Sequence, residues 1–170
     1  MVISDTYIGM TMLALERDHS MLTVRVVRGI VNHFPIRKSE WGMALAAFGM
    51  ALVLRFQPDM FENGKSFTTM AQWADETTWG LFAVIIAIIR FIALGVNGTF
   101  QGFGYSPHLR LFASVAGLLF WSQFVLGVLI AAYFHEGAMS AIVAYGTFCF
   151  FEGCNIFQSA WDRDQQARKK

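Results

Sequence analysis

Residues 111–134 read LFASVAGLLFWSQFVLGVLIAAYF, and this run contains no charged side chain. Ser122 and Gln123, near its middle, are its most polar pair. A helix that crosses a bilayer needs about 20 predominantly apolar residues, whereas a barrel strand needs about 10 that alternate in polarity. The run has the length and the uniform apolar character of a transmembrane helix.

The composition of the whole chain agrees with a membrane protein. Of its 170 residues, 55% are hydrophobic and 15% are charged, against roughly 25% charged residues in a typical soluble domain. The apolar content excludes intrinsic disorder, and a net charge of +1 gives no global basic field for nucleic acid. Charges are sparse from Thr77 to Trp161, where the chain carries only Arg90, Arg110, Glu136 and Glu152.

Three further apolar runs predict additional spans. Residues 41–54 form a short run, which Arg55 can extend by reaching for the membrane interface. Residues 79–96 form a second run that contains Arg90, and residues 137–161 form a last run that contains Glu152. We therefore predict an all-α, polytopic membrane protein with four transmembrane helices, occupying residues 39–161.

The basic residues indicate an orientation. An even number of spans places both termini on one side of the membrane. The loop on the opposite side, the acidic segment 58–78, then contains a single basic residue, Lys65. The positive-inside rule then predicts that both termini are cytoplasmic. Basic residues expected at that interface are Arg25, Arg28, Arg37, Lys38 and Arg110, and residues 162–170 form a basic cytoplasmic tail.

Residues 1–38 precede the first span, and residues 21–34 have the pattern of an amphipathic helix. Val24, Val27 and Phe34 fall on one side, Arg25 and Arg28 on another, and the following proline ends the helix. Such a helix beside a membrane is expected to lie in the interface. The alternative, equally open from the sequence, is that it packs on the transmembrane bundle or on a partner.

Arg90 and Glu152 are the informative intramembrane residues. A charge in hydrocarbon is costly, about 2.5–3.5 kcal/mol on insertion scales, and usually has a partner. In a four-span layout the two residues lie at similar depth, roughly 10 Å and 13 Å from the inner end of their helices. We expect them to pair inside the bundle. The alternative is that Arg90 reaches lipid phosphates alone while Glu152 is protonated. Gln123 and Arg55 are the other intramembrane polar residues.

The sequence shows no arrangement typical of catalysis or of cofactor binding. Cys149 and Cys154 point in different directions on one helix, and the four histidines lack metal-ligand spacing. The glycines of residues 98–104 follow a membrane helix rather than a strand, so they predict a turn and not a phosphate site. We expect no enzyme, no metal and no cofactor.

Short motifs along the second half of the chain resemble a known group of proteins. They are WG at 79–80, Arg90, ALGVNG at 93–98, SPHLR at 106–110, Trp121, Gln123, Glu152, Asn155, Ala160 and Asp162, before a basic end. This layout resembles small four-helix membrane proteins encoded by tailed bacteriophages, best from Trp79 onward. The resemblance implies a phage origin and a bacterial inner membrane, and it carries no functional residue over.

Three functional hypotheses follow. The first is a non-enzymatic membrane protein that acts by contact with lipid, with other copies of itself, or with a membrane-protein partner. The second is a holin-like lysis protein, favoured by small size and the charged C-terminus. The third is a small proton or ion transporter, for which the only support is the expected pair of intramembrane charges.

Overall fold

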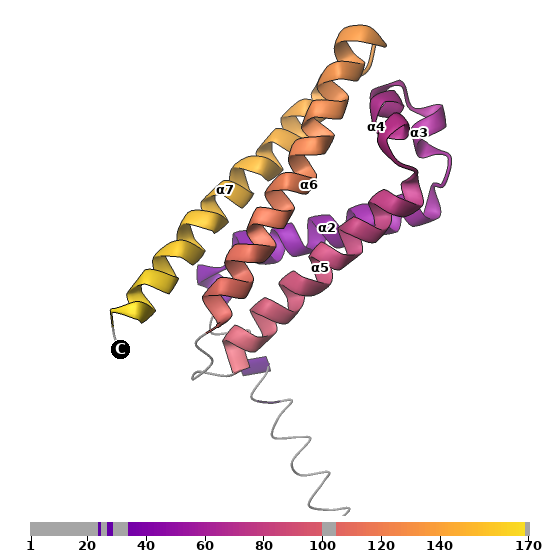
Figure 1. Ribbon diagram of the computed structural model, residues 1–170. Helices are drawn as coiled ribbons and strands as arrows, with labels where there is room; N and C mark the ends of the chain where they lie inside the picture. Colours follow the sequence, from indigo (N-terminus) through magenta and orange to yellow (C-terminus); the bar gives the residue numbers. More distant parts are fainter. Residues whose placement is uncertain (1–23, 25–26, 29–33, 100–104, 169–170) are drawn as a thin grey trace, which may run out of the picture.

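The computed structural model describes residues 24, 27–28, 34–99 and 105–168, and every regular element within them is helical (Figure 1). Two elements are short 3-10 helices, η1 and η2. The elements are η1 (Phe34–Ile36), α2 (Lys38–Phe56), α3 (Met60–Asn63), η2 (Lys65–Phe67), α4 (Thr68–Trp73), α5 (Glu76–Thr99), α6 (Ser106–Phe134) and α7 (Ser140–Ala167).

Four of these helices, α2, α5, α6 and α7, are long and apolar enough to cross a membrane. They contain 19, 24, 29 and 28 residues, and the shortest is still about 28 Å long at 1.5 Å per residue, close to the hydrocarbon thickness of about 30 Å. The predicted fold class is therefore confirmed. The short run at 41–54 is part of a longer helix because α2 begins at Lys38 and ends at Phe56, before Pro58.

The four long helices form two pairs, α2 with α5 and α6 with α7, and α5 joins the pairs by packing on α6 (Figure 1). The beginnings of α2 and α6 and the end of α7 lie together, held by ion pairs between their side chains. We call this end of the molecule the charged end. The opposite end, where α3, η2 and α4 pack beside the turn between α6 and α7, is the loop end.

The segment at the loop end is more structured than the sequence indicated. Residues 58–78, expected to be a loop, contain the short helices α3, η2 and α4. Glu76 accepts a hydrogen bond from the backbone N–H of Phe61 at 2.8 Å, and Ser66 accepts one from the backbone N–H of Ala138 at 2.8 Å. Tertiary contacts therefore hold helices that are too short to be stable alone.

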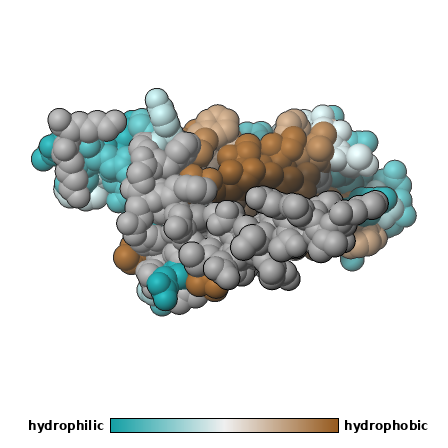
Figure 2. All heavy atoms as spheres, turned by 90° about the horizontal axis from the view of Figure 1, so that it is seen from below, coloured by the Kyte–Doolittle hydropathy of each residue, from teal (hydrophilic) through white to brown (hydrophobic). Residues whose placement is uncertain are grey.

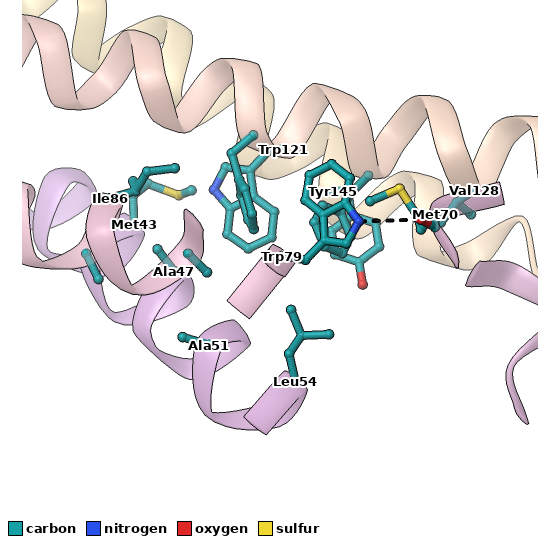
Figure 3. Close-up of a cluster of buried hydrophobic side chains, with 14 of the residues drawn as sticks. Met43, Ala47, Ala51, Leu54, Met70, Trp79, Ile86, Trp121, Val128 and Tyr145 are labelled. Carbon is teal, nitrogen blue, oxygen red and sulfur yellow. Dashed lines mark hydrogen bonds between the residues drawn. The ribbon is translucent and has the colours of Figure 1, made fainter. Parts of the chain in front are cut away.

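Aromatic side chains of α5, α6 and α7 pack together in the hydrophobic core, and Figure 3 shows Trp79, Trp121 and Tyr145 among them. Trp79 of α5 packs edge-on against Phe124 of α6, with ring centroids 5.5 Å apart, and donates its indole N–H to the carbonyl of Met70 at 3.4 Å. Trp121 of α6 stacks on Tyr145 of α7 at 5.9 Å. These rings fill the space between three long helices and leave it apolar.

The outer surface has the distribution of polarity that a bilayer requires. Figure 2 shows hydrophobic residues gathered in the middle of one face and hydrophilic residues toward both ends of the molecule. Large apolar side chains are exposed on all four long helices, among them Leu45, Leu81, Phe112 and Phe150. The chain is a multi-pass membrane protein whose helices contact lipid.

The segments outside the spans agree only in part with the predicted boundaries. Val24, Val27 and Arg28 are helical and exposed, and Phe34 begins η1. The other residues of the predicted N-terminal helix, including Arg25, lie outside the described residues. At the other end, α7 continues to Ala167. The first residues of the expected tail are thus the last turns of a transmembrane helix.

Candidate functional site

The inward face of α7 changes character along its length. Its buried or partly buried residues recur every three or four positions: Tyr145, Phe148, Glu152, Asn155, Ser159 and Asp162. This spacing places them on one stripe of the helix. The stripe is aromatic near the loop end and polar toward the charged end. We call the residues from Glu152 to Asp162, together with the side chains that they meet on α2, α5 and α6, the polar seam.

Arg90 of α5 and Glu152 of α7 form the deepest contact of the polar seam. Nη2 of Arg90 lies 2.6 Å from Oε2 of Glu152, and the two side chains are 2% and 1% exposed. The same Nη2 donates to the carbonyl oxygen of Ala113 on α6 at 3.0 Å. The pairing expected from their similar depth is present, so Arg90 does not extend to lipid phosphates alone.

The contact between these two side chains is made at a single nitrogen. Nε and Nη1 of Arg90 and Oε1 of Glu152 are buried without a hydrogen-bond partner among the described residues. A guanidinium and a carboxylate can make two parallel hydrogen bonds when they meet squarely. Here Nη2 of Arg90 alone donates both to the carboxylate of Glu152 and to the carbonyl of Ala113, so the pair ties α7 to both α5 and α6.

A second ionic cluster occupies the charged end. Arg110, in the first turns of α6 and 1% exposed, donates from Nε to Oε2 of Glu40 at 2.8 Å and from Nη2 to Oε1 of the same carboxylate. Its Nη1 donates to Oδ2 of Asp162 at 2.6 Å. One guanidinium therefore joins α6 to α2 with two hydrogen bonds and to α7 with a third.

Arg37 completes this cluster from just before α2. Its Nη2 lies 3.4 Å from Oδ2 of Asp162, and its Nη1 lies 4.0 Å from Oε1 of Glu40. Burial, and then the positive charge of Arg110, lower the pKa of Arg37, against the opposing effect of the two carboxylates. The cluster contains two guanidiniums and two carboxylates, so its formal charge is zero.

Asn155 connects the two ionic clusters along α7. Its Oδ1 accepts a hydrogen bond from the hydroxyl of Ser39 at 2.6 Å, which adds a contact between α2 and α7. Asn155 and Ser159 are completely buried, and Nδ2 of Asn155 and Oγ of Ser159 have no partner among the described residues. The seam is thus polar without interruption from Asp162 to Glu152.

Two residues predicted at the interface are buried by protein contacts. Arg110 lies at the charged end, and its guanidinium is buried between two carboxylates. Arg37 is also mostly buried and paired. Among the members of that group that the structure describes, Arg28 and Lys38 are exposed. The sequence prediction did not include Glu40 and Asp162. The signal that could have indicated them was spacing: Glu40 lies three residues after Arg37, and Asp162 lies ten residues after Glu152.

The remaining predicted polar residues lie outside the seam. Gln123 is partly buried on α6. Arg55 is exposed in the last turn of α2, at the loop end of the bundle. Neither is brought near Arg90 or Glu152 by a hydrogen bond or an ion pair among the described residues.

The geometry of the polar seam suits it for fixing helices relative to one another. Each of its carboxylates accepts hydrogen bonds from a guanidinium of a different helix. Beyond Glu152 the seam meets the aromatic cluster around Trp121 and Tyr145, which continues into the loop-end half of the bundle. Polar side chains therefore extend from the charged end to the Arg90–Glu152 pair and no further along α7's inward stripe.

Together these features define the class: an integral membrane protein of four spans with an internal ionic seam. Comparison of the chain with protein-family models, with curated proteins and with solved structures finds no match.

Proposed function

We propose that this protein acts without catalysis, by binding other membrane helices, and that the outward side of α7 is its contact surface. The single observation that carries the proposal is the contrast between the two sides of α7. Its inner side is tied to three helices by ion pairs and hydrogen bonds. Its apolar window is nevertheless only 11% buried, against 28–39% for the other spans.

The outward side of α7 alternates small and large residues. Gly146, Phe150, Gly153 and Phe157 recur at intervals of four, three and four residues, and Trp161 follows. Phe157 is 79% exposed, and a side chain added at either glycine would meet nothing within 4 Å. Close packing of membrane helices uses small residues that admit large ones from a neighbour. We call this surface the α7 outer face.

The polar seam supports a contact role over a pore-forming one. A holin-like protein has to separate and reassemble its helices, and breaking a buried ion pair costs about 3–5 kcal/mol when one partner is left unpaired. A transporter needs polar groups along its path, and the aromatic cluster of Trp79, Trp121 and Tyr145 fills the loop-end half of the core. A bundle held by internal ion pairs, with α7 as its least covered span, fits a binding protein better.

A photo-crosslinking experiment tests the proposal. Phe157 is replaced by a photoreactive phenylalanine analogue, and Phe82, which is exposed on α5, receives the same analogue as the matched control. We expect a protein adduct of discrete mass at position 157, either with a second copy or with a partner, and only lipid adducts at position 82.

A variant on the same face shows whether the adduct reports packing. A Cβ at Gly153 meets nothing within 4 Å, so Gly153→Leu adds a bulky side chain on the α7 outer face, and we expect it to remove the adduct at position 157. Gly49→Leu, at another glycine with open space around it, serves as its control. Lipid adducts alone at position 157, or an adduct that Gly153→Leu leaves unchanged, would contradict the proposal.

We also infer that the charged end faces the cytoplasm of a bacterial inner membrane. Five basic side chains of the described residues lie at this end, and two lie at the loop end, Arg55 and Lys65; positive residues favour the cytoplasmic side. The test is labelling of Lys65→Cys and Arg168→Cys, in a chain without Cys149 and Cys154, by a thiol reagent that does not cross membranes. In intact cells only Lys65→Cys should react.

A further inference from the structure

A groove of about 330 Å³ lies between the end of α2 and the beginning of α5. Its walls are mostly apolar and include Phe48, Leu52, Gly80 and Val84. Its volume is at the lower end of the range for small-molecule sites, about 300–1,000 Å³. The groove belongs to two membrane-spanning helices near their loop-end termini, so it meets the bilayer close to the depth of the lipid headgroups.

Two side chains of opposite charge also line the groove. Arg55 is exposed in the last turn of α2, and it makes no hydrogen bond or ion pair within the described part of the chain. Glu76 is in the first turn of α5, and its Oε1 accepts the hydrogen bond from the backbone N–H of Phe61. Arginines near the ends of membrane helices direct their charge to the headgroup region, where phosphate is the complementary group.

The surrounding charges select among lipid headgroups. From Arg55 to Glu76 the chain carries two basic and four acidic side chains, a net charge of −2. A headgroup with a net negative charge would gain Arg55 as a partner and be repelled by Glu76, which also lines the groove, and by the net negative charge of this segment. A zwitterionic headgroup has no net charge, and its ammonium group is attracted to the same acids.

We propose that this groove binds one zwitterionic glycerophospholipid of the phosphatidylethanolamine type. Its phosphodiester is held by the guanidinium of Arg55, its ammonium lies on the side of Glu76, and one acyl chain occupies the apolar groove. The site is separate from the α7 outer face and from the polar seam.

Native mass spectrometry of the full chain, released from micelles that contain a defined phospholipid, measures the retained lipid. Phosphatidylethanolamine and phosphatidylglycerol with identical acyl chains are the two probes. We expect one retained phosphatidylethanolamine, bound about tenfold more tightly than phosphatidylglycerol. Arg55→Gln should reduce this retention to the level of phosphatidylglycerol, whereas Arg168→Gln, an exposed arginine at the charged end, should leave it unchanged.

A second variant blocks the groove itself. Gly80 lines it, and a Cβ there would stand 3.5 Å from Cβ of Leu54, so Gly80→Leu directs a larger side chain into the space between α2 and α5. Retention of the lipid should be lost, with Gly49→Leu as control. If Gly80→Leu unfolds, the test rests on Arg55→Gln. Arg55 has no hydrogen-bond or ion-pair partner among the described residues, so its substitution breaks no such contact within the fold.

Two outcomes would overturn the assignment. Equal retention of both lipids by the wild type and by Arg55→Gln would indicate only a non-specific lipid layer. Tighter binding of phosphatidylglycerol would show that Arg55 selects net negative charge and that the acidic side chains play no part.

Discussion

Gly117 of α6 faces the carboxylate of Glu152 on α7 so closely that a methyl group at position 117 would lie 2.8 Å from Cδ and would overlap Oε1. The same methyl group would lie 3.0 Å from Nη2 of Arg90. The ion pair between α5 and α7 thus depends on a residue of α6 that has no side chain. Three helices meet at this point: α5 contributes the guanidinium, α7 contributes the carboxylate, and α6 contributes the glycine that leaves space for both.

Gly117→Ala is expected to lower the stability of the bundle. The added methyl group displaces the Glu152 carboxylate from Arg90, and overpacking of this kind costs about 1–3 kcal/mol. Thermal unfolding in detergent, followed by circular dichroism, should show a lower Tm. Gly49→Ala on α2, where a Cβ meets nothing within 4 Å, is the matched control, and equal effects of the two substitutions would contradict the role of Gly117.

The Arg90–Glu152 pair should show strong energetic coupling. Arg90→Ala or Glu152→Ala alone leaves one buried charge without its partner, at a cost of about 3–5 kcal/mol, whereas removing both leaves a smaller penalty. We therefore expect the double variant to be less destabilised than the sum of the single variants. The measurement is the free energy of unfolding of all four proteins, and strict additivity would rule the coupling out.

At the charged end, the two partners of Arg110 should contribute unequally. Glu40→Ala removes the carboxylate that accepts two hydrogen bonds from the buried guanidinium of Arg110, and we expect a loss of about 3–5 kcal/mol. Asp162→Asn removes a carboxylate whose side chain is 33% exposed. Because water already screens much of its charge, the free energy of unfolding should fall by only about 1 kcal/mol. Unfolding in denaturant at one detergent concentration compares them, and the reverse ranking would contradict the described network.

Asp75 should make the loop end sensitive to acid. The hydroxyl of Thr78 and then the backbone N–H of Thr78, whose donor–acceptor distance to Oδ1 is 2.8 Å, lower the pKa of Asp75. Because the pKa is lower in the folded state, the stabilisation is complete above the ordinary aspartate pKa and is lost as pH falls through the lowered value.

The variant Thr78→Val tests this relation. It removes the largest cause of the lowered pKa of Asp75 and keeps the backbone donor. The acid-induced loss of Tm should then be smaller than in the wild type and should be complete at a higher pH. Asp75→Asn, which retains a capping oxygen without a titrating group, should abolish that part of the pH dependence; an unchanged acid profile in both variants would exclude Asp75 as its source.

We expect replacement of Glu136 by glycine to stabilise the folded protein. Its φ of 58° is left-handed, a conformation that costs a non-glycine residue about 1–2 kcal/mol, whereas glycine adds about 0.5–1 kcal/mol of unfolded-state entropy. The lost ion pair with Lys65 is exposed on both sides and contributes little. Glu136→Gly should raise the Tm slightly, while Glu136→Ala, which removes the same carboxylate and keeps the strain, should not.

Much of the fold was predictable because the physical constraint on it is local. A run such as 111–134 has to be helical in hydrocarbon, since only a helix or a closed barrel satisfies its backbone there. The depth of Arg90 and Glu152 followed from helix rise alone. The sequence predicts a loop for the segment 58–78, because its short helices depend on tertiary contacts such as that between Glu76 and Phe61.

The ionic cluster at the charged end was not predictable in the same way. Counting positive charges assigns Arg110 and Arg37 to one side of the membrane, and it does not say which helix faces which. The burial of Arg110 follows from α2 and α7 bringing Glu40 and Asp162 to the same point. Sequence separations of 70 and 52 residues make this a property of the assembled bundle.

The polar seam has a consequence for biogenesis. Helices of a membrane protein are synthesised in chain order, so Arg90 and Arg110 enter the bilayer before Glu152 exists. Of the two, Arg110 finds Glu40 already present on α2, whereas the partner of Arg90 arrives only with α7. An intermediate with three inserted helices therefore carries an uncompensated cation within its membrane interior. Insertion of the last helix is the step that neutralises it, and completion of synthesis becomes a condition for a stable product.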